Sequence, residues 1–260
     1  MSDKERPKAT AVGLQDRVLE GWFNGKTSEL APGVFIRASD TVIDVGCGDG
    51  GFIGFCARQG AEVIFVDRDA EKVAATEARV KPSGAHAYRA IVSDCDPIPL
   101  EDGTGDLVIC TEVLEHVADP AQFLAELVRI TKPGSRLLIT VPDDRSERLV
   151  ASTAPKMYFE EPNHIRIFST EEFMALIESA GLEIESHLQV GCFWSIYWPL
   201  SWLTCDPHGE GLPVDNPHPI TDHWTRLWLE LQQHPEGGKV RDALNTLLPK
   251  SQSILARKPA

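Results

Sequence analysis

Glu112, Glu115 and His116 lie in the stretch TEVLEHV, and their types and spacing are suited to acid–base or metal chemistry. Two carboxylates and an imidazole are ligands that Mg²⁺, Mn²⁺ or Zn²⁺ accept. Separations of three and four residues predict that one turn of helix presents all three on one face. His164, in NHIRIF, is the candidate fourth ligand. The sequence therefore predicts a metal site made of Glu112, Glu115, His116 and His164.

The two histidines also suit catalysis without a metal. An imidazole titrates near neutrality, so His116 or His164 is the expected general base for an acceptor hydroxyl. At both positions the alternative is a hydrogen-bonded histidine with a structural role. The pattern predicts catalytic histidines and leaves the metal as one of two routes.

The stretch VIDVGCGDGGF, residues 42–52, indicates a ligand site of a different kind. Its glycines satisfy the G-x-G-x-x-G pattern that binds a pyrophosphate, ending at Gly51, and equally a G-x-G-x-G pattern. Asp44 stands two residues before the first glycine, where a carboxylate repels a pyrophosphate and attracts an ammonium or sulfonium group. The sequence therefore favours a cationic ligand over NAD. The glycines of the favoured pattern are Gly46, Gly48 and Gly50.

Continuous apolar runs alternate with helical patterns along most of the chain, which is typical of a parallel sheet covered on both faces. The predicted strands are residues 41–46, 61–67, 86–92, 106–111, 135–141, 181–190 and 253–258. An N-cap with a following proline at Asp119 and Pro120, and a capping box from Ser169 to Glu172, start two of the helices. We expect an α/β, Rossmann-like, doubly wound and mostly parallel seven-stranded sheet, with its ligand at the carboxyl ends of the strands.

Two segments interrupt the alternation of strands and helices. Residues 143–168 are expected to form an irregular connection, and residues 191–250 a helical insertion between the last two strands. Tryptophans recur at helical spacing in this insertion, which predicts two amphipathic helices that either pack on the domain or form an apolar lid over the acceptor. The expected domains are an N-terminal tail and capping helix (1–37), a cofactor-binding domain (38–190 and 251–260) and a helical lid (191–250).

The ends of the insertion and of the chain suggest two further features. The first dozen residues are polar and are expected to form a disordered tail, followed by a helix through Val18, Leu19 and Trp22. The loop between the tryptophan-containing helices offers a second acid–base or metal site, although its prolines and glycines favour a solvated loop. The residues of that second candidate site are His208, Asp215, His218, Asp222 and His223.

The composition restricts the class of partner. The 260 residues carry a formal charge of −14, which disfavours nucleic acid as a substrate. The longest aromatic-rich apolar stretch, residues 191–204, is too short to cross a bilayer, and the first residues lack a secretory signal. Six cysteines form no C-x-x-C pair, so a reduced, cytoplasmic protein is expected.

Four segments, in their order along the chain, resemble the class I S-adenosylmethionine (SAM)-dependent methyltransferases. They are VIDVGCGDGG, VIFVDRD, SDCDPIPLEDGTGDLVICTEVLEHV and KPGSRLLITVPD. The resemblance covers residues 38–190 and the closing strand, and it implies that SAM is the cofactor. By this resemblance Asp44 and the turn from Gly46 to Gly50 hold the methionine moiety, and Asp67 takes the ribose hydroxyls. Asp94 with the Cys95 amide would read the adenine, Thr111 would line the pocket floor, and Arg68 belongs to the same cofactor set.

The narrower pattern E-x-x-E-H with a later histidine resembles the metal-assisted O-methyltransferases of ubiquinone biosynthesis and the plant small-RNA 2′-O-methyltransferases. It implies methyl transfer to a hydroxyl, with Mg²⁺ or another divalent metal as a second cofactor. The expected acceptor is a small molecule, and the interpretation of the insertion as an apolar lid predicts that it is hydrophobic or aromatic. N- or C-methylation and a SAM-binding module without catalysis are the alternatives, and an NAD-dependent oxidoreductase is the least favoured. A homodimer is the protein partner considered.

Overall fold

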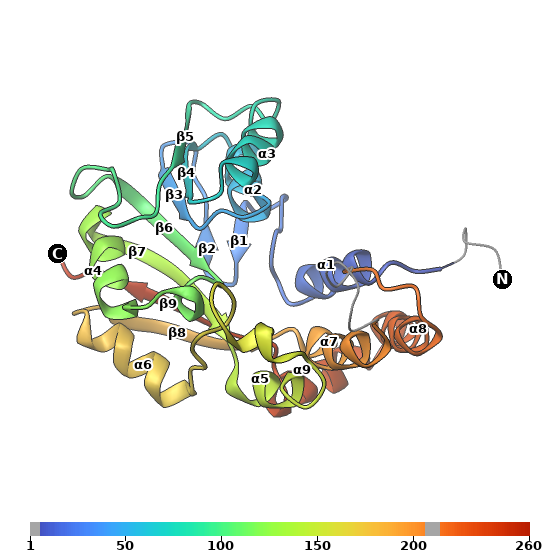
Figure 1. Cartoon of the computed structure of the whole chain (residues 1–260). Helices are drawn as coiled ribbons and strands as arrows, with labels where there is room; N and C mark the ends of the chain where they lie inside the picture. Colours follow the sequence, from blue (N-terminus) through green and yellow to red (C-terminus); the bar gives the residue numbers. More distant parts are fainter. Residues whose placement is uncertain (1–5, 206–213) are drawn as a thin grey trace.

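The computed structural model describes residues 6–205 and 214–260, and its centre is a seven-stranded sheet (Figure 1). The strand order is β5–β4–β3–β6–β7–β9–β8. The strands are β3 (Thr41–Val45), β4 (Glu62–Asp67), β5 (Tyr88–Val92), β6 (Gly105–Thr111), β7 (Thr131–Pro142), β8 (Glu183–Val190) and β9 (Ser251–Arg257). Neighbouring strands from β5 to β7 are parallel, and β9 is antiparallel to both β7 and β8. The predicted mostly parallel, seven-stranded α/β fold is confirmed.

Helices cover both faces of the sheet because its central strands are apolar on both sides. Val42 and Val63 face a cluster that includes the helices α2 (Gly51–Arg58) and α3 (Ala70–Val80). Ile43 and Val45 face another cluster that includes α4 (Pro120–Ile130) and α6 (Thr170–Ser179). Because these strands are parallel, their carboxyl ends lie along the same edge of the sheet. In such a fold the ligand site lies at that edge.

Two of the predicted helix starts are found where the sequence placed them. Asp119 caps α4, with its carboxylate accepting from the amides of Ala121 and Gln122, and Pro120 is the first helical residue. Ser169 and Glu172 form the predicted capping box of α6. Each cap satisfies amides that a helix cannot pair internally.

The connection between β7 and α6 is more regular than the sequence suggested. It contains the helix α5 (Asp144–Val150) and the short 3₁₀ helix η3 (Lys156–Phe159). Asp143, fully buried, caps α5 by accepting from the Arg145 amide and ion-pairs with the Arg145 side chain. The expectation of an irregular connection was wrong because a seven-residue helix is too short to show a repeating apolar pattern.

The described residues of the insertion form three helices, where the sequence predicted two. These are α7 (Cys192–Thr204), α8 (Pro219–Gln233) and α9 (Gly237–Leu247). The N-terminal helix α1 (Ala9–Leu19) joins them, and it lies beside α7 and α8 on one flank of the molecule (Figure 1). Their shared core contains Ala9, Val12, Cys192, Phe193, Tyr197 and Trp228. The plainer interpretation of the tryptophan pattern, helices that pack on the domain, accounts for this cluster.

The start of the chain also differs from the expectation of a disordered dozen residues. Helix α1 begins at Ala9, and Ala9 and Val12 are buried against the insertion. The helix ends before Trp22, which is buried in the sheet cluster on the side of α2. The segment from Trp22 to the sheet includes a short antiparallel pair, β1 (Glu29–Ala31) and β2 (Val34–Phe35). Within the described part of the chain, no helix is long and apolar enough to cross a membrane.

Replacing Phe193 with Ala should lower the free energy of unfolding by roughly 3–5 kcal/mol, because the change leaves a cavity in the helical core. Phe193 is fully buried and its ring lies parallel to that of Trp224, with centroids 6.3 Å apart. Leu203→Ala in the same helix is the matched control, since 63% of Leu203 is exposed. Urea unfolding measures both values, and equal losses for the two variants would contradict the packing described.

Candidate active site

The glycine turn after β3 is fixed by close approaches that exclude side chains. Gly46, Gly48 and Gly50 all have positive φ, at 76°, 52° and 74°, so the G-x-G-x-G pattern is the one that shapes the turn. A Cβ on Gly46 would lie 2.3 Å from a methyl of Val113, and one on Gly50 would lie 2.7 Å from the Thr76 side chain. Gly51 begins α2 with ordinary helical backbone. The turn therefore needs glycine for conformation at three positions and for space at two.

A cavity of about 590 Å³ lies at the carboxyl ends of β3, β4 and β6. It is lined by the glycine turn, by residues at the ends of β4 and β5, and by residues 111–113, 116, 117, 123, 162 and 163. Its volume is within the range of ordinary small-molecule sites. The predicted cofactor residues that line it are Gly46, Gly48, Asp67, Arg68, Asp94, Cys95 and Thr111.

Asp67 is held in position by backbone amides. Its carboxylate accepts from the Gly48 amide and from the Asp69 amide, each at 3.0 Å. These bonds join the end of β4 to the glycine turn and leave lone pairs of the carboxylate for a ligand. This is the geometry that the binding of ribose hydroxyls requires.

The two residues predicted to contact adenine, Asp94 and Cys95, both line the cavity, but the Cys95 amide already has a partner. Asp94 accepts from the Asp96 amide at 3.3 Å and lines the cavity. The Cys95 amide, expected to contact adenine, instead donates to the Ser93 hydroxyl at 3.0 Å, and Cys95 has a φ of 66°. The amide is therefore engaged within its own turn in this structure.

Asp44 lies at the end of β3, buried, and it is not among the residues that line the cavity. One of its carboxylate oxygens, Oδ1, has no hydrogen-bond partner. Burial raises the pKa of Asp44 to about 7, and the nearby charges of Asp67 and Asp49 add to the rise, while a backbone hydrogen bond from Ile53 opposes it. A buried carboxylate in this condition is stabilised by a cation and destabilised by a further anion.

Glu112 does not share a helical face with Glu115 and His116, so that part of the prediction was wrong. The chain turns at Glu112, whose φ is 55°, and only the short 3₁₀ helix η2 (Leu114–His116) follows. The Glu112 carboxylate accepts from the Thr140 hydroxyl at 2.8 Å, and its other oxygen lies 3.9 Å from Lys250 Nζ. The left-handed backbone directs this side chain toward β7.

His116 is the histidine that lines the cavity. Its Nδ1 donates to the carbonyl oxygens of Asn163, at 2.9 Å, and Pro162, at 3.2 Å. Carbonyl oxygens only accept, so these contacts assign the ring proton to Nδ1. The Nε2 lone pair accepts no hydrogen bond from a described residue, and Glu115 Oε1 lies 3.7 Å from it. Burial lowers the pKa of His116, and the neighbouring His164 adds to the lowering. His116 is therefore a neutral imidazole that can accept a proton.

Three of the four predicted metal ligands, Glu115, His116 and His164, lie close together. One ligand atom from each of Glu115, His116 and His164 lies within 4.8 Å of the others. Glu115 is fully buried, and both of its carboxylate oxygens lack a hydrogen-bond partner. Burial and the Glu112 charge raise the pKa of Glu115 well above its usual range. These donors suit a divalent cation, and Glu112 lies outside the group.

Two residues of the site were missed by the sequence reasoning. Glu147, in α5, accepts from His164 Nδ1 at 2.7 Å, and Lys250 Nζ lies 3.3 Å from the other Glu147 oxygen. Burial alone raises the pKa of Glu147, but the hydrogen bond from His164 and the charge of Lys250 outweigh it, and the pKa is lowered. A signal for Lys250 existed, because the residue before an antiparallel last strand must lie at the carboxyl end of its neighbour.

Three residues of the second candidate site in the insertion, Asp215, His218 and Asp222, have structural roles. Asp215 accepts from the Thr10 backbone and hydroxyl, His218 caps α8, and Asp222 pairs with Arg6 at 3.5 Å. His208 lies outside the described residues. The contacts of Asp215 and Asp222 join the insertion to the N-terminal segment.

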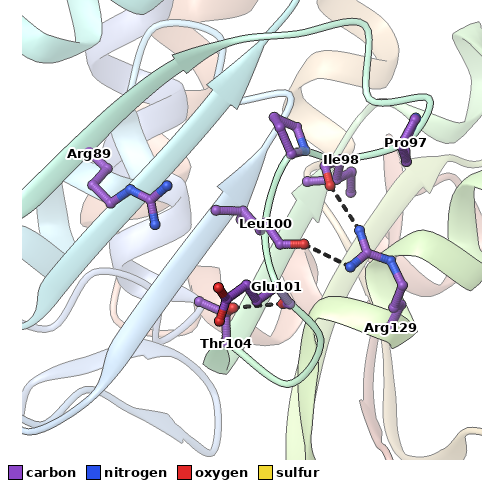
Figure 2. Close-up of a pocket in the computed structure, with 8 residues that line it drawn as sticks. Arg89, Pro97, Ile98, Leu100, Glu101, Thr104 and Arg129 are labelled. Atoms are coloured by element: carbon purple, nitrogen blue, oxygen red, sulfur yellow. Dashed lines mark hydrogen bonds between the residues drawn. The ribbon is translucent and has the colours of Figure 1, made fainter.

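A larger hollow, of about 780 Å³, lies away from all of these residues (Figure 2). It is bordered by Arg89 of β5 and by the loop 97–104, whose Ile98 and Leu100 carbonyls accept from Arg129. Arg129 is thus used to hold the loop, and no residue predicted to act in catalysis is present. We therefore take the smaller cavity as the functional one.

Residues 21–187 match the family model described as a methyltransferase domain. The chain belongs to the S-adenosylmethionine-dependent methyltransferase family. This membership confirms the resemblance of the sequence motifs, and it gives no support to the NAD-dependent alternative.

Two curated relatives and one solved structure illustrate the likeness. A ubiquinone biosynthesis O-methyltransferase from Xanthomonas euvesicatoria pv. vesicatoria is 29% identical over 57% of this chain and 64% of the relative. The chloroplastic tocopherol O-methyltransferase of Arabidopsis thaliana is 40% identical over 38% of this chain and 29% of the relative. The chain thus spans less than two thirds of the length of either relative.

The solved structure is geranyl diphosphate C-methyltransferase from Streptomyces coelicolor A3(2), in complex with Mg²⁺, geranyl-S-thiolodiphosphate and S-adenosyl-L-homocysteine. It is 16% identical, has a TM-score of 0.57, and covers 96% of this chain and 76% of that one. A likeness at this identity shows the shared fold.

Asp44→Asn should remove a pH-dependent loss of stability. The folded pKa of about 7 exceeds the ordinary value of 3.8, so the folded chain retains a proton that the unfolded chain releases between these values. The ligand-free wild type should therefore lose stability relative to the variant as the pH rises through that window, by at most roughly 4 kcal/mol.

Urea unfolding at pH values on either side of this window measures the difference. The exposed Asp49→Asn, in the same turn, is the control for the loss of a charge. A constant difference between wild type and Asp44→Asn across the range would contradict the buried, unpartnered carboxylate.

Proposed function

We propose that this chain transfers the methyl group of SAM to a hydroxyl of a small molecule. The observation that carries the proposal is one cavity lined by two chemically different sets of residues. The first set is the glycine turn with Asp67 and Asp94, and the second includes His116, whose Nδ1 carries the ring proton. The first set suits an adenosyl cofactor, and the second, which forms the proposed acceptor end, suits an acceptor that must lose a proton.

The residues fit SAM on two grounds. Asp67 is presented by two amides with lone pairs available for ribose hydroxyls. The unpartnered Oδ1 of Asp44, beneath the turn, lowers the energy of a positively charged ligand through its field and raises that of a diphosphate. SAM, when bound, supplies a methyl group on a sulfonium, which is the electrophile of the reaction.

The chain's own contribution is alignment and proton removal. Methyl transfer is an in-line displacement, which requires that acceptor and methyl be held in line and that water be excluded. As the acceptor oxygen bonds to carbon, its proton must leave, and Nε2 of His116 is the lone pair available for it. The carbonyls of Pro162 and Asn163 stabilise the imidazolium that results.

Oxygen as the acceptor atom is supported by the names of the two relatives, both O-methyltransferases. The solved neighbour is a C-methyltransferase, so N- or C-methylation is the alternative. We propose a hydrophobic or aromatic acceptor, because Val113, Val117 and Phe123 line the same cavity as His116. The charge of −14 supports a small molecule over nucleic acid.

The burial of Glu115 without hydrogen-bond partners supports a metal-assisted route. Two unpartnered oxygens in a fully buried carboxylate, beside two imidazoles, form a donor set that a divalent cation would satisfy. Glu115, His116 and His164 would hold the ion, and the ion would lower the pKa of the acceptor hydroxyl. In that arrangement Nε2 of His116 would hold the ion and would not act as the base, and the lowered pKa would let the hydroxyl release its proton to solvent water.

The proposal has four further parts. The insertion acts as a lid, α1 caps the cofactor pocket, the chain forms a homodimer, and the protein is cytoplasmic. Among the described residues of α1 and of the insertion, none lines the cavity. Phe52, which does line it, packs against Trp22 and Phe23 just after α1. Closure by either element would therefore require movement relative to this structure.

His116→Asn should lower kcat by about 10²–10⁴, the usual contribution of a general base or acid, and leave SAM affinity unchanged. The asparagine amide can replace Nδ1 as donor to the carbonyls of residues 162 and 163, so the loop is retained while Nε2 is lost. The assay is release of S-adenosylhomocysteine with a panel of phenols, sugars and amines. Equal rates for the two proteins would remove His116 from the chemistry.

The same assay distinguishes an enzyme from a module that only binds SAM. Release that depends on an added acceptor requires turnover. SAM binding without acceptor-dependent release for any acceptor class would favour the binding module.

If a divalent ion acts at Glu115, a chelator should abolish activity, and Mn²⁺, Mg²⁺ or Zn²⁺ should restore it. Glu115→Gln should behave like the chelated enzyme, whereas Glu112→Gln should keep its metal affinity because Glu112 lies outside the group. Titration calorimetry with each ion measures the affinity directly. Full activity after chelation would leave His116 as a base and exclude the metal route.

A further inference from the structure

A buried row of charged groups, Glu147 and Lys250, extends from His164. His164 Nδ1 is 2.7 Å from Glu147 Oε2, and Lys250 Nζ is 3.3 Å from Glu147 Oε1. The exposed fractions of these three side chains are 14%, 1% and 11%. Charges this well buried interact strongly and are costly to leave unpaired, so the row must act as a unit.

We propose that Glu147 and Lys250 are positioning residues that hold His164 with its proton on Nδ1, and so keep Nε2 free for a proton or a metal ion. The inference rests on the function proposed above. Glu147 as a carboxylate can only accept, so the nitrogen that contacts it must carry the hydrogen. The second nitrogen of His164 is then a lone pair in the ring that neighbours His116, with centroids 5.0 Å apart.

The backbone builds this row from three separate segments. The Lys250 carbonyl accepts from the amide of Asp143, the residue that caps α5, and α5 carries Glu147. The Lys250 amide donates to the Val190 carbonyl at the end of β8. These two bonds fix Lys250 against α5, and therefore fix its ammonium relative to Glu147.

Tyr158 holds the imidazole from another side. Its ring lies 4.5 Å from that of His164, centroid to centroid, and its hydroxyl is 3.5 Å from Glu147 Oε1. The imidazole of His164 therefore has both its hydrogen bond and its ring plane constrained. Lys250 is the last residue of segment 191–250, so the insertion reaches the site through a buried cation.

Glu147→Gln tests the proposal because Lys250 determines how the new amide is oriented. An ammonium only donates, so the amide oxygen must face Lys250 and the NH₂ group must face His164 Nδ1. His164 would then accept at Nδ1 and carry its proton on Nε2, the wrong tautomer. A similar carboxylate-to-amide change in a serine protease lowers kcat by about 10⁴. We expect a loss of kcat of about 10²–10⁴ here, with unchanged SAM affinity.

Imidazole ¹⁵N NMR of the full chain, at a pH of about 8 where ordinary imidazoles are neutral, reports the tautomer without any need for activity. His164→Gln identifies the signals. The wild type should show a protonated Nδ1 and Glu147→Gln a protonated Nε2. Glu147→Asp, which keeps a carboxylate, should retain the wild-type tautomer and recover part of kcat. Glu160→Gln, the same change at an exposed position nearby, should alter neither.

Two results would overturn the proposal. One is a proton on Nε2 of His164 in the wild type, a measurement that stands even if a variant fails to fold. The other is a tautomer change in Glu147→Gln with an unchanged kcat. An inactive wild type would contradict the proposed function alone, because the tautomer measurement still decides whether Glu147 and Lys250 position the ring.

Discussion

A buried carboxylate with an unpartnered oxygen, at the end of the central strand, is the constraint on which the site depends. Asp44 is paired through its backbone with β4 and β6, so it cannot move to reach solvent. The glycine turn that follows is packed against Val113 and Thr76, so it cannot open to admit water without disrupting its neighbours. A ligand with positive charge offsets the cost of burying this group, and a diphosphate increases it. The choice of ligand class is therefore built into the fold.

The acceptor end of the cavity depends on the reversal of the last strand. Since β9 is antiparallel to β7, its first residue lies beside Pro142, at the carboxyl edge of the sheet. This reversal brings Lys250 to the same edge as η2 and the connection after β7. The two histidines meet there with different partners: backbone carbonyls for His116 and a carboxylate for His164. Two imidazoles in contact can thus have different chemical roles.

The sequence predicted the features that depend on local chemistry. Apolar runs predicted most strands of the large sheet, since a strand buried on both faces needs a continuous run, and the alternation of apolar and polar residues predicted β8 near the edge. The glycine turn, the caps at Asp119 and Ser169, and the cavity position of Asp67 and His116 also followed from type and spacing, whereas the position of Asp94 was implied by the family resemblance.

The failures depended on tertiary contacts. Helical spacing placed Glu112 with Glu115, but a left-handed residue and the hydroxyl of Thr140 redirect its side chain. Glu147 and Lys250 are 103 residues apart in sequence, and nothing in either local pattern indicates the other. The N-terminal residues were judged polar, yet Ala9 and Val12 are buried by helices more than 180 residues away.

Calorimetric titration of the wild-type chain with SAM and, separately, with NADH tests the central claim most directly. The account predicts that SAM binds with a measurable dissociation constant and that NADH gives no binding heat beyond dilution, because a cation stabilises the ionised form of the buried Asp44 and a diphosphate destabilises it. Saturable binding of NADH at the glycine turn, with SAM ignored, would contradict it.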